Sequence, residues 1–196
     1  HVLLAQKAFS MYHFYPLIGS YLSGATASGL YEARLAHEEM PGRENHIFSP
    51  AYRAEEFPEI LRICDHIVFN SFAQWKRFGP AALAAGRECG LRINPECSTQ
   101  EHAIYDPCAP GSRLGTRRAA IDAAGGRAAL AELDGLHFHT LCEQGADALD
   151  VIAHKQLENP RIASLLLGLT LVLLGELLGR GLFYGLHMTV GMAVAG

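Results

Sequence analysis

A lysine at the end of a short apolar run is the residue of this sequence best suited to covalent chemistry. Residues 2–5 (Val-Leu-Leu-Ala) lead to Lys7, and Phe9 follows closely. An ammonium group among apolar side chains loses hydration, which lowers its pKa and favours the neutral amine. A neutral lysine amine can attack a carbonyl group and form a Schiff base. The alternative is an ordinary lysine at a strand end, because most lysine side chains contact solvent.

Two histidines within residues 135–144 (Gly-Leu-His-Phe-His-Thr-Leu-Cys-Glu-Gln) form the second group with chemical potential. In an extended strand, His137 and His139 share one face. They could bind zinc with a nearby thiol or carboxylate, although two ligands do not complete a tetrahedral site. One ring could instead stack on a flat cofactor, or both could form hydrogen bonds to the backbone. The spacing leaves these three interpretations open.

Short apolar segments alternate with helical patterns through the part of the chain that carries these residues. We expect strands at residues 2–5, 24–27, 46–48, 66–70, 91–94 and 136–139. We expect helices at residues 15–22, 30–39, 54–63, 72–85, 117–131 and 146–157. Strands that alternate with helices in this way are typical of a parallel sheet.

The residues that follow the expected strands distinguish two parallel architectures. A doubly wound sheet with a dinucleotide site needs a glycine-rich turn after its first strand, and residues 7–10 (Lys-Ala-Phe-Ser) do not provide one. Polar residues instead follow nearly every expected strand, as in barrels, which collect site residues from many strand ends. We therefore predict an α/β fold: an incomplete TIM (β/α) barrel of about six parallel strands, followed by an apolar helix near the carboxyl terminus.

Composition limits the classes of function. The chain has 196 residues and a net charge of −4, and it has no cluster of lysine and arginine, which argues against nucleic-acid binding. Its five cysteines lack the spacing of a metal or redox motif, which indicates reduced thiols and a cytoplasmic location. The sequence begins inside an expected strand and shows no signal peptide. We therefore expect it to be a fragment of a longer protein.

Seven segments, in one order, resemble the carboxynorspermidine decarboxylases. They are Lys7 after the first strand and residues 28–35, 48–53, 64–71, 90–95, 107–115 and 138–144. That family belongs to the pyridoxal-phosphate-dependent decarboxylases built like alanine racemase, with ornithine and diaminopimelate decarboxylases as relatives. The resemblance extends over residues 2–150. It implies a homodimeric lyase of polyamine biosynthesis that decarboxylates carboxynorspermidine or carboxyspermidine to norspermidine or spermidine.

The resemblance also implies roles for individual residues. Lys7 matches the lysine that holds pyridoxal 5′-phosphate covalently. His139 matches the histidine whose ring stacks on the pyridine ring of the cofactor. The family's chemistry would begin when the substrate amine displaces Lys7 from the cofactor, which then accepts the electron pair left by carbon dioxide.

Five further residues are candidates with structural alternatives. Arg92, Arg113 and Glu32 match cofactor-site positions; a core hydrogen bond for Arg92 and surface ion pairs for Arg113 and Glu32 are the alternatives. Cys142 matches a serine near the cofactor in ornithine-type relatives, and it could equally be a small buried apolar residue. Glu143 is a candidate to meet the polycationic substrate, and a solvated loop carboxylate is its alternative.

The family's remaining parts would follow residue 150. They are a glycine-rich phosphate loop, the last two barrel strands, the acid that pairs with the pyridine nitrogen, and a β-rich second domain. We therefore expect this chain by itself to be catalytically incomplete.

The last part of the chain has a different composition. Residues 162–179 carry only one formal charge, at Glu176, and as a helix they would extend roughly 27 Å, nearly the thickness of a bilayer core. Residues 173–185 resemble the last membrane helix of the anchor subunit of dimethyl-sulfoxide-reductase-type enzymes. We therefore expect two parts, a partial barrel at 1–157 and a hydrophobic, possible transmembrane tail at 158–196, with a fusion or a mis-assembled reading frame near 151–161. The alternatives are an apolar helix native to the decarboxylase, or a membrane anchor fragment whose soluble part is incidental.

Overall fold

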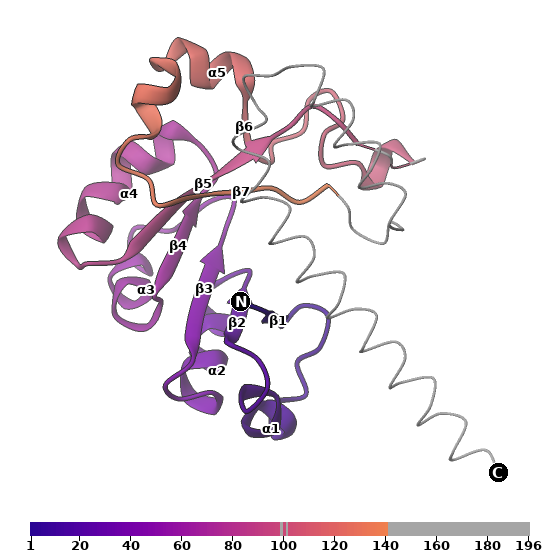
Figure 1. The fold of residues 1–196 in the computed structure, drawn as a ribbon, viewed down its shortest axis with the longest axis vertical. Helices are drawn as coiled ribbons and strands as arrows, with labels where there is room; N and C mark the ends of the chain where they lie inside the picture. Colours follow the sequence, from indigo (N-terminus) through magenta and orange to yellow (C-terminus); the bar gives the residue numbers. More distant parts are fainter. Residues whose placement is uncertain (99, 101, 141–196) are drawn as a thin grey trace.

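The fold is built on one parallel sheet (Figure 1). The computed structural model describes residues 1–98, 100 and 102–140. The strands are β1 (Leu3–Ala5), β2 (Gly24–Ala27), β3 (Glu44–Phe48), β4 (His66–Phe69), β5 (Glu88–Asn94), β6 (Thr116–Arg117) and β7 (Gly135–His137). The helices are η1 (Tyr12–Phe14), α1 (Tyr15–Gly19), α2 (Leu30–Glu39), α3 (Phe57–Ile63), α4 (Phe72–Ala84), η2 (Ala103–Tyr105), α5 (Arg118–Ala123) and η3 (Gly126–Leu130).

The strands follow one another across the sheet in chain order. β1 to β5 pair successively and in parallel, and β5 also pairs with β7 through Leu91 and Leu136. The short β6 pairs only with the end of β5, at Ile93 and Asn94. A doubly wound sheet would reverse its order at a switch point, so the predicted parallel α/β fold is confirmed and the doubly wound alternative is wrong for the described strands. Because no register pair in this part of the chain joins β1 to β7, the described sheet is open.

The structure corrects the expected elements in two places. The helix expected at 117–131 is interrupted, because Gly125 and Gly126 adopt φ values of 112° and 62° that end α5 and start η3. The strand β6, which the turn-rich sequence before it concealed, was not expected. The six expected strands are all present, with ends displaced by up to three residues, as at Glu88 for an expected start at Leu91. The expected helix at 146–157 and the tail at 158–196 lie outside the described residues.

One face of the sheet packs against α2, α3 and α4 (Figure 1). Strand residues such as Ile47, Ile67 and Leu91 are fully buried there, against Ile60 of α3 and Phe78 of α4. Burial of each large apolar side chain contributes about 1.5–3 kcal/mol. This layer therefore fixes the strands from behind and leaves their other face to carry polar groups.

The face of the sheet away from these helices is lined by aromatic and charged side chains. His46 of β3 stacks on His66 of β4, with ring centroids 3.8 Å apart. Further along the strands, Phe48 lies 5.3 Å from the ring of His137 and under the guanidinium of Arg92. This face would form the interior of a closed barrel.

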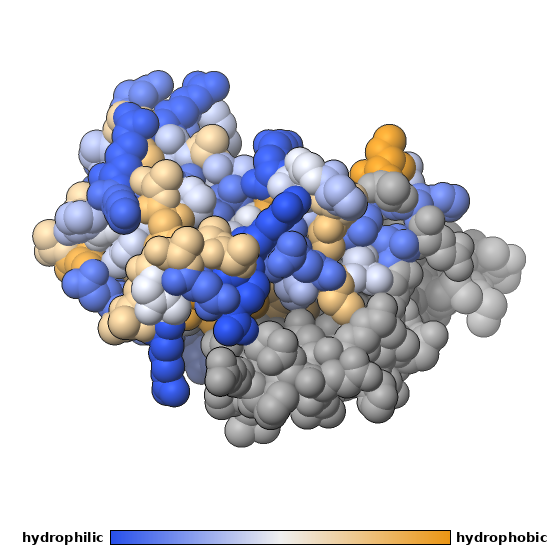
Figure 2. Space-filling model, turned by 90° about the horizontal axis from the view of Figure 1, so that it is seen from above, coloured by the Kyte–Doolittle hydropathy of each residue, from blue (hydrophilic) through white to orange (hydrophobic). Residues whose placement is uncertain are grey.

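The molecular surface mixes hydrophilic and apolar residues on the side that Figure 2 shows. Several large exposed apolar side chains occur close together in the sequence around η1 and α1: Met11, Tyr12, Phe14, Leu17 and Tyr21.

None of the helices in the described part of the chain is long and apolar enough to cross a lipid bilayer.

Candidate active site

The carboxyl ends of β1, β5 and β7 bring four cationic or imidazole side chains together. They are Lys7, Arg92, His137 and His139. Burial above all, and then the neighbouring charges of Arg92, His139 and Lys7, lower the pKa of His137 to about 3. The sheet register places Arg92 directly opposite His137. The two sequence candidates follow strand ends at the same edge of the sheet, Lys7 after β1 and His139 after β7.

Lys7 lies in a turn just after β1. The backbone N–H groups of Ala8 and Phe9 donate to the carbonyl of Ala5, at 2.9 and 3.2 Å, and fix this turn. The Lys7 side chain is exposed, so the expected enclosure by Leu, Ala and Phe is wrong for the described residues. The reason is that the chain turns away immediately after β1, while the neighbouring apolar side chain of Leu4 packs toward the helices.

Arg92 is a buried cation on β5, on the face of the sheet that points away from α2, α3 and α4. Only 6% of the residue is exposed, and its guanidinium carbon lies 4.6 Å from the centre of the Phe48 ring. Burial lowers its pKa to about 10, so the group is still charged at neutral pH. A buried cation held against an aromatic face can attract an anionic ligand, because the surroundings screen its charge weakly.

Several buried polar atoms near these strand ends have no hydrogen-bond partner among the described residues. They are Gln6 Nε2, Asn94 Nδ2, His137 Nδ1 and Thr140 Oγ1. Buried polar atoms are usually paired in native proteins, and exceptions point to a ligand, an ion or ordered water. The unpaired atoms follow or end β1, β5 and β7, where Lys7 and Arg92 also lie. These unpaired atoms could therefore form hydrogen bonds to a polar ligand.

Asn70, which the sequence reasoning did not select as a site residue, fixes the turn that carries Arg113. Its Nδ2 donates to the carbonyl of Arg113 at 2.8 Å, and the N–H of Gly115 donates to its Oδ1 at 2.7 Å. The hydroxyl of Thr116 also donates to the Asn70 carbonyl, at 3.2 Å. The Arg113 side chain itself is exposed. The signal for Asn70 was its place as a polar residue directly after a buried strand.

Glu32 contacts the start of a helix in this structure. Glu32 lies in the first turn of α2, and its carboxylate accepts a hydrogen bond of 2.6 Å from the backbone N–H of Ser28, just before the helix. A carboxylate there satisfies an otherwise unpaired N–H group and interacts favourably with the helix dipole. The contact stabilises the start of α2, and the proposed cofactor role of Glu32 stays a prediction. Cys142 and Glu143 lie outside the described residues.

Comparison with curated proteins relates most of the chain to decarboxylases. It is 42% identical over 149 residues to carboxyaminopropylagmatine decarboxylase of Synechocystis sp., which covers 76% of this chain and 37% of that protein. It is 42% identical over 151 residues to carboxynorspermidine/carboxyspermidine decarboxylase of Campylobacter jejuni, covering 77% of this chain and 38% of the relative. The chain thus spans less than two-fifths of the length of these relatives. No family model matches.

A solved structure of such a decarboxylase is also similar to this chain. The crystal structure of carboxynorspermidine decarboxylase complexed with norspermidine, from Campylobacter jejuni, superposes with a TM-score of 0.66 at 39% identity. The match covers 80% of this chain and 38% of that one. The resemblance to these decarboxylases inferred from the seven segments is therefore confirmed.

A short stretch of the chain matches a different protein. Over 37 residues it is 70% identical to the anaerobic dimethyl sulfoxide reductase chain YnfH of Escherichia coli, which covers 19% of this chain and 13% of that protein. The second resemblance seen in the sequence is therefore also confirmed, over a short length.

Proposed function

We propose that this chain is the amino-terminal part of a pyridoxal-phosphate-dependent carboxy-lyase of the carboxynorspermidine decarboxylase kind. The observation that carries the proposal is the placement of Lys7, Arg92, His137 and His139 in or just after the carboxyl-terminal parts of strands of one parallel sheet. Its sequence support is 42% identity over 151 residues to such a decarboxylase. The sequential order of the strands further supports a sheet that is part of a (β/α) barrel.

The residues present fit the cofactor. Lys7 would hold its aldehyde carbon, because the amine is exposed at a strand end and can be reached. Arg92 would face an anionic group of the cofactor, and the unpaired Nδ1 of His137 offers a hydrogen bond. His139 would pack on the ring, as the family resemblance implies. When bound, pyridoxal phosphate supplies an electron sink for the bond that breaks as carbon dioxide leaves.

The protonation states on this face suit decarboxylation. His137 stays neutral at physiological pH because its pKa is lowered to about 3. It therefore positions a ligand without adding charge, and it does not serve as a cationic acid. Arg92 remains positive and can orient the carboxylate or phosphate of bound molecules. Release of carbon dioxide requires an orientation that these fixed groups would impose.

The substrate class follows from the shared chemistry of the relatives. Their names describe polyamine or agmatine derivatives that carry a carboxylate. We propose a carboxylated polyamine, carboxynorspermidine or carboxyspermidine, with the corresponding polyamine as product. Glu143 is the proposed partner of its amino groups and Cys142 a proposed group near the cofactor, and a homodimer is the proposed assembly.

Reconstitution with pyridoxal phosphate tests this proposal. We expect the 196-residue chain to bind about one equivalent of cofactor through a lysine, visible as a new absorbance band that borohydride removes. We also expect no release of carbon dioxide from carboxynorspermidine above the rate with free cofactor, because the chain spans 38% of the length of its decarboxylase relative. Absence of binding would contradict the proposed site. Turnover would contradict the proposed incompleteness alone.

A second proposal concerns the tail at residues 158–196. A stretch of 37 residues is 70% identical to a dimethyl sulfoxide reductase chain, and the decarboxylase matches cover 149 and 151 residues of this chain. We propose that two unrelated segments join near residues 151–161 and that the tail is a membrane element. The alternative function, a membrane anchor fragment, would then belong to this segment alone.

Truncation after Pro160 tests the tail. We expect the full chain to need detergent to stay in solution, because residues 162–179 carry one formal charge and their transfer to an apolar phase is favourable. The chain that ends at Pro160 should stay in solution without detergent. Equal behaviour of the two chains in sedimentation with and without detergent would refute a membrane role for the tail.

A further inference from the structure

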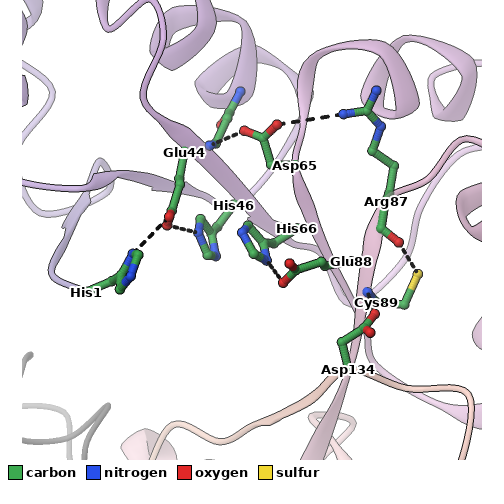
Figure 3. A network of polar contacts seen from close by, with 10 residues as sticks. His1, Glu44, His46, Asp65, His66, Arg87, Glu88, Cys89 and Asp134 are labelled. Atoms are coloured by element: carbon green, nitrogen blue, oxygen red, sulfur yellow. Dashed lines mark hydrogen bonds and ion pairs between the residues drawn. The ribbon is translucent and has the colours of Figure 1, made fainter.

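A second polar cluster lies at the amino-terminal ends of the same strands that carry the candidate active site (Figure 3). Glu44 begins β3, His66 begins β4 and Glu88 begins β5, while His46 is two residues into β3. Their side chains are on the inner face of the sheet. Since the strands are parallel, this cluster and the group around Lys7 lie at opposite ends of that face.

The sheet register brings the two histidines together. His46 and His66 are direct partners in the pairing of β3 with β4. Their rings stack with centroids 3.8 Å apart and planes inclined by 12°. With Glu44 they offer three ligand atoms that all lie within 4.8 Å of one another. One carboxylate and two imidazoles form a donor set that zinc accepts in many proteins.

A carboxylate orients the ring of His66. His66 Nδ1 contacts Glu88 Oε2 at 2.8 Å, which leaves its Nε2 to face a ligand. A histidine that binds a metal usually donates its other ring N–H group to a carboxylate or carbonyl in this manner. Glu44 contacts His46 Nε2 at 3.0 Å and His1 Nδ1 at 2.8 Å, one through each carboxylate oxygen. Figure 3 shows the two stacked rings between these carboxylates.

The spacing between Glu44 and His46 suits a shared ion. In tetrahedral zinc, ligands about 2.0–2.2 Å from the metal lie roughly 3.3 Å from one another. The observed 3.0 Å between Glu44 Oε2 and His46 Nε2 is close to this value.

We propose that Glu44, His46 and His66 bind a divalent transition-metal ion, with Zn²⁺ as the favoured ion. Glu88 is a positioning residue that orients His66. Three protein ligands leave a fourth position, which water would occupy. The ion would join β3 to β4 at the end of the sheet remote from Lys7. This proposal is independent of the cofactor site.

Zinc titration of the tag-free chain, without pyridoxal phosphate, tests the site. Calorimetry should show about one high-affinity zinc ion per chain, and cobalt should give the visible absorption of a four-coordinate site. His66→Gln should raise the Kd for zinc by at least about 100-fold, and Glu88→Gln should raise it by about 10- to 100-fold. His37→Gln is the matched control, because this histidine is exposed in the last turn of α2.

Two further variants test which histidines bind the zinc ion. His46→Gln should weaken zinc binding as His66→Gln does, and circular dichroism shows whether each variant keeps its fold. The double variant His137→Gln/His139→Gln should bind zinc as the parent chain does, which separates this cluster from the alternative zinc interpretation of that pair. Failure to bind zinc, or zinc binding that survives both His66→Gln and His46→Gln, overturns the proposal.

Discussion

Replacing Lys7 by alanine is expected to abolish covalent attachment of pyridoxal phosphate to this chain. The lysine amine is the nucleophile that would hold the aldehyde, and alanine removes it completely. Lys7 is exposed just after β1. After incubation with the cofactor and reduction with borohydride, we expect the labelled fraction to fall at least about tenfold. Intact-mass spectrometry measures the attached cofactor directly and needs no catalytic turnover.

The sequence provides a matched control for this experiment. It contains three lysines, Lys7, Lys76 and Lys155. Lys76 is exposed on α4, so Lys76→Ala removes a comparable amine from the helical layer of the fold. That variant should label as the parent chain does. Peptide mapping that finds the cofactor equally on Lys76, or unchanged labelling of Lys7→Ala, would contradict the proposed attachment.

An arginine variant separates chemistry from charge. Lys7→Arg keeps the positive charge near His137, but guanidinium does not form the same bond with an aldehyde. It should therefore label as poorly as Lys7→Ala. Recovery of labelling in Lys7→Arg would show that the amine acts through charge alone.

The strands were predictable because their apolar residues pack against helices. Ile47, Ile67 and Leu91 are all buried on one face of the sheet, and such residues dominate the sequence pattern of parallel strands. The start of β5 at Glu88 was missed because its first residues include a charge and a glycine. The interrupted helix after α5 reflects two glycines whose backbone conformation a helical pattern does not encode.

The candidate site was predictable only in part. Lys7 and His139 emerged from a family resemblance and from their place after strands, and in the structure Lys7 follows β1 and His139 follows β7. Exposure of Lys7 depends on where the chain turns after β1, which local sequence does not determine. Contacts between distant segments, such as Asn70 with the turn at 113–116, are set by the tertiary fold.

The cluster of Glu44, His46 and His66 at the amino-terminal ends of the strands could not be predicted from the sequence either. His46 and His66 are twenty positions apart in the numbering, and neither lies in a recognisable metal motif. Register alone makes them direct neighbours, because β3 and β4 pair with His46 opposite His66. A parallel sheet can thus assemble one site at each end of its inner face from residues that have no local signature.

Replacing Asn70 by alanine is expected to destabilise the fold and release the turn at 113–116. Asn70 is 9% exposed and its side chain bridges Arg113 and Gly115 through two hydrogen bonds. Its removal leaves a carbonyl and an N–H group without these partners, and each lost partner costs about 1–3 kcal/mol. We expect the free energy of unfolding to fall by about 2–5 kcal/mol, measured by urea denaturation.

Asn70→Asp is the matched variant. It keeps an oxygen that accepts from Gly115 N–H, but it cannot donate to the Arg113 carbonyl when ionised. Its effect on the free energy of unfolding should therefore be smaller than that of alanine, because the bond from Gly115 N–H is kept. Below the pKa of the new carboxyl group the loss should become smaller still, because the protonated acid can donate a hydrogen bond again.

Proteolysis locates the loss of stability. Trypsin should cut after Arg113 faster in Asn70→Ala, because the turn loses the contacts that hold it to the end of β4. Arg77 on α4 provides the internal reference, since α4 begins with its own cap at Ser71, whose hydroxyl accepts a hydrogen bond from Gln74. The ratio of cleavage after Arg113 to cleavage after Arg77 should rise. An unchanged ratio together with an unchanged free energy of unfolding would show that the bridge through Asn70 does not hold the turn.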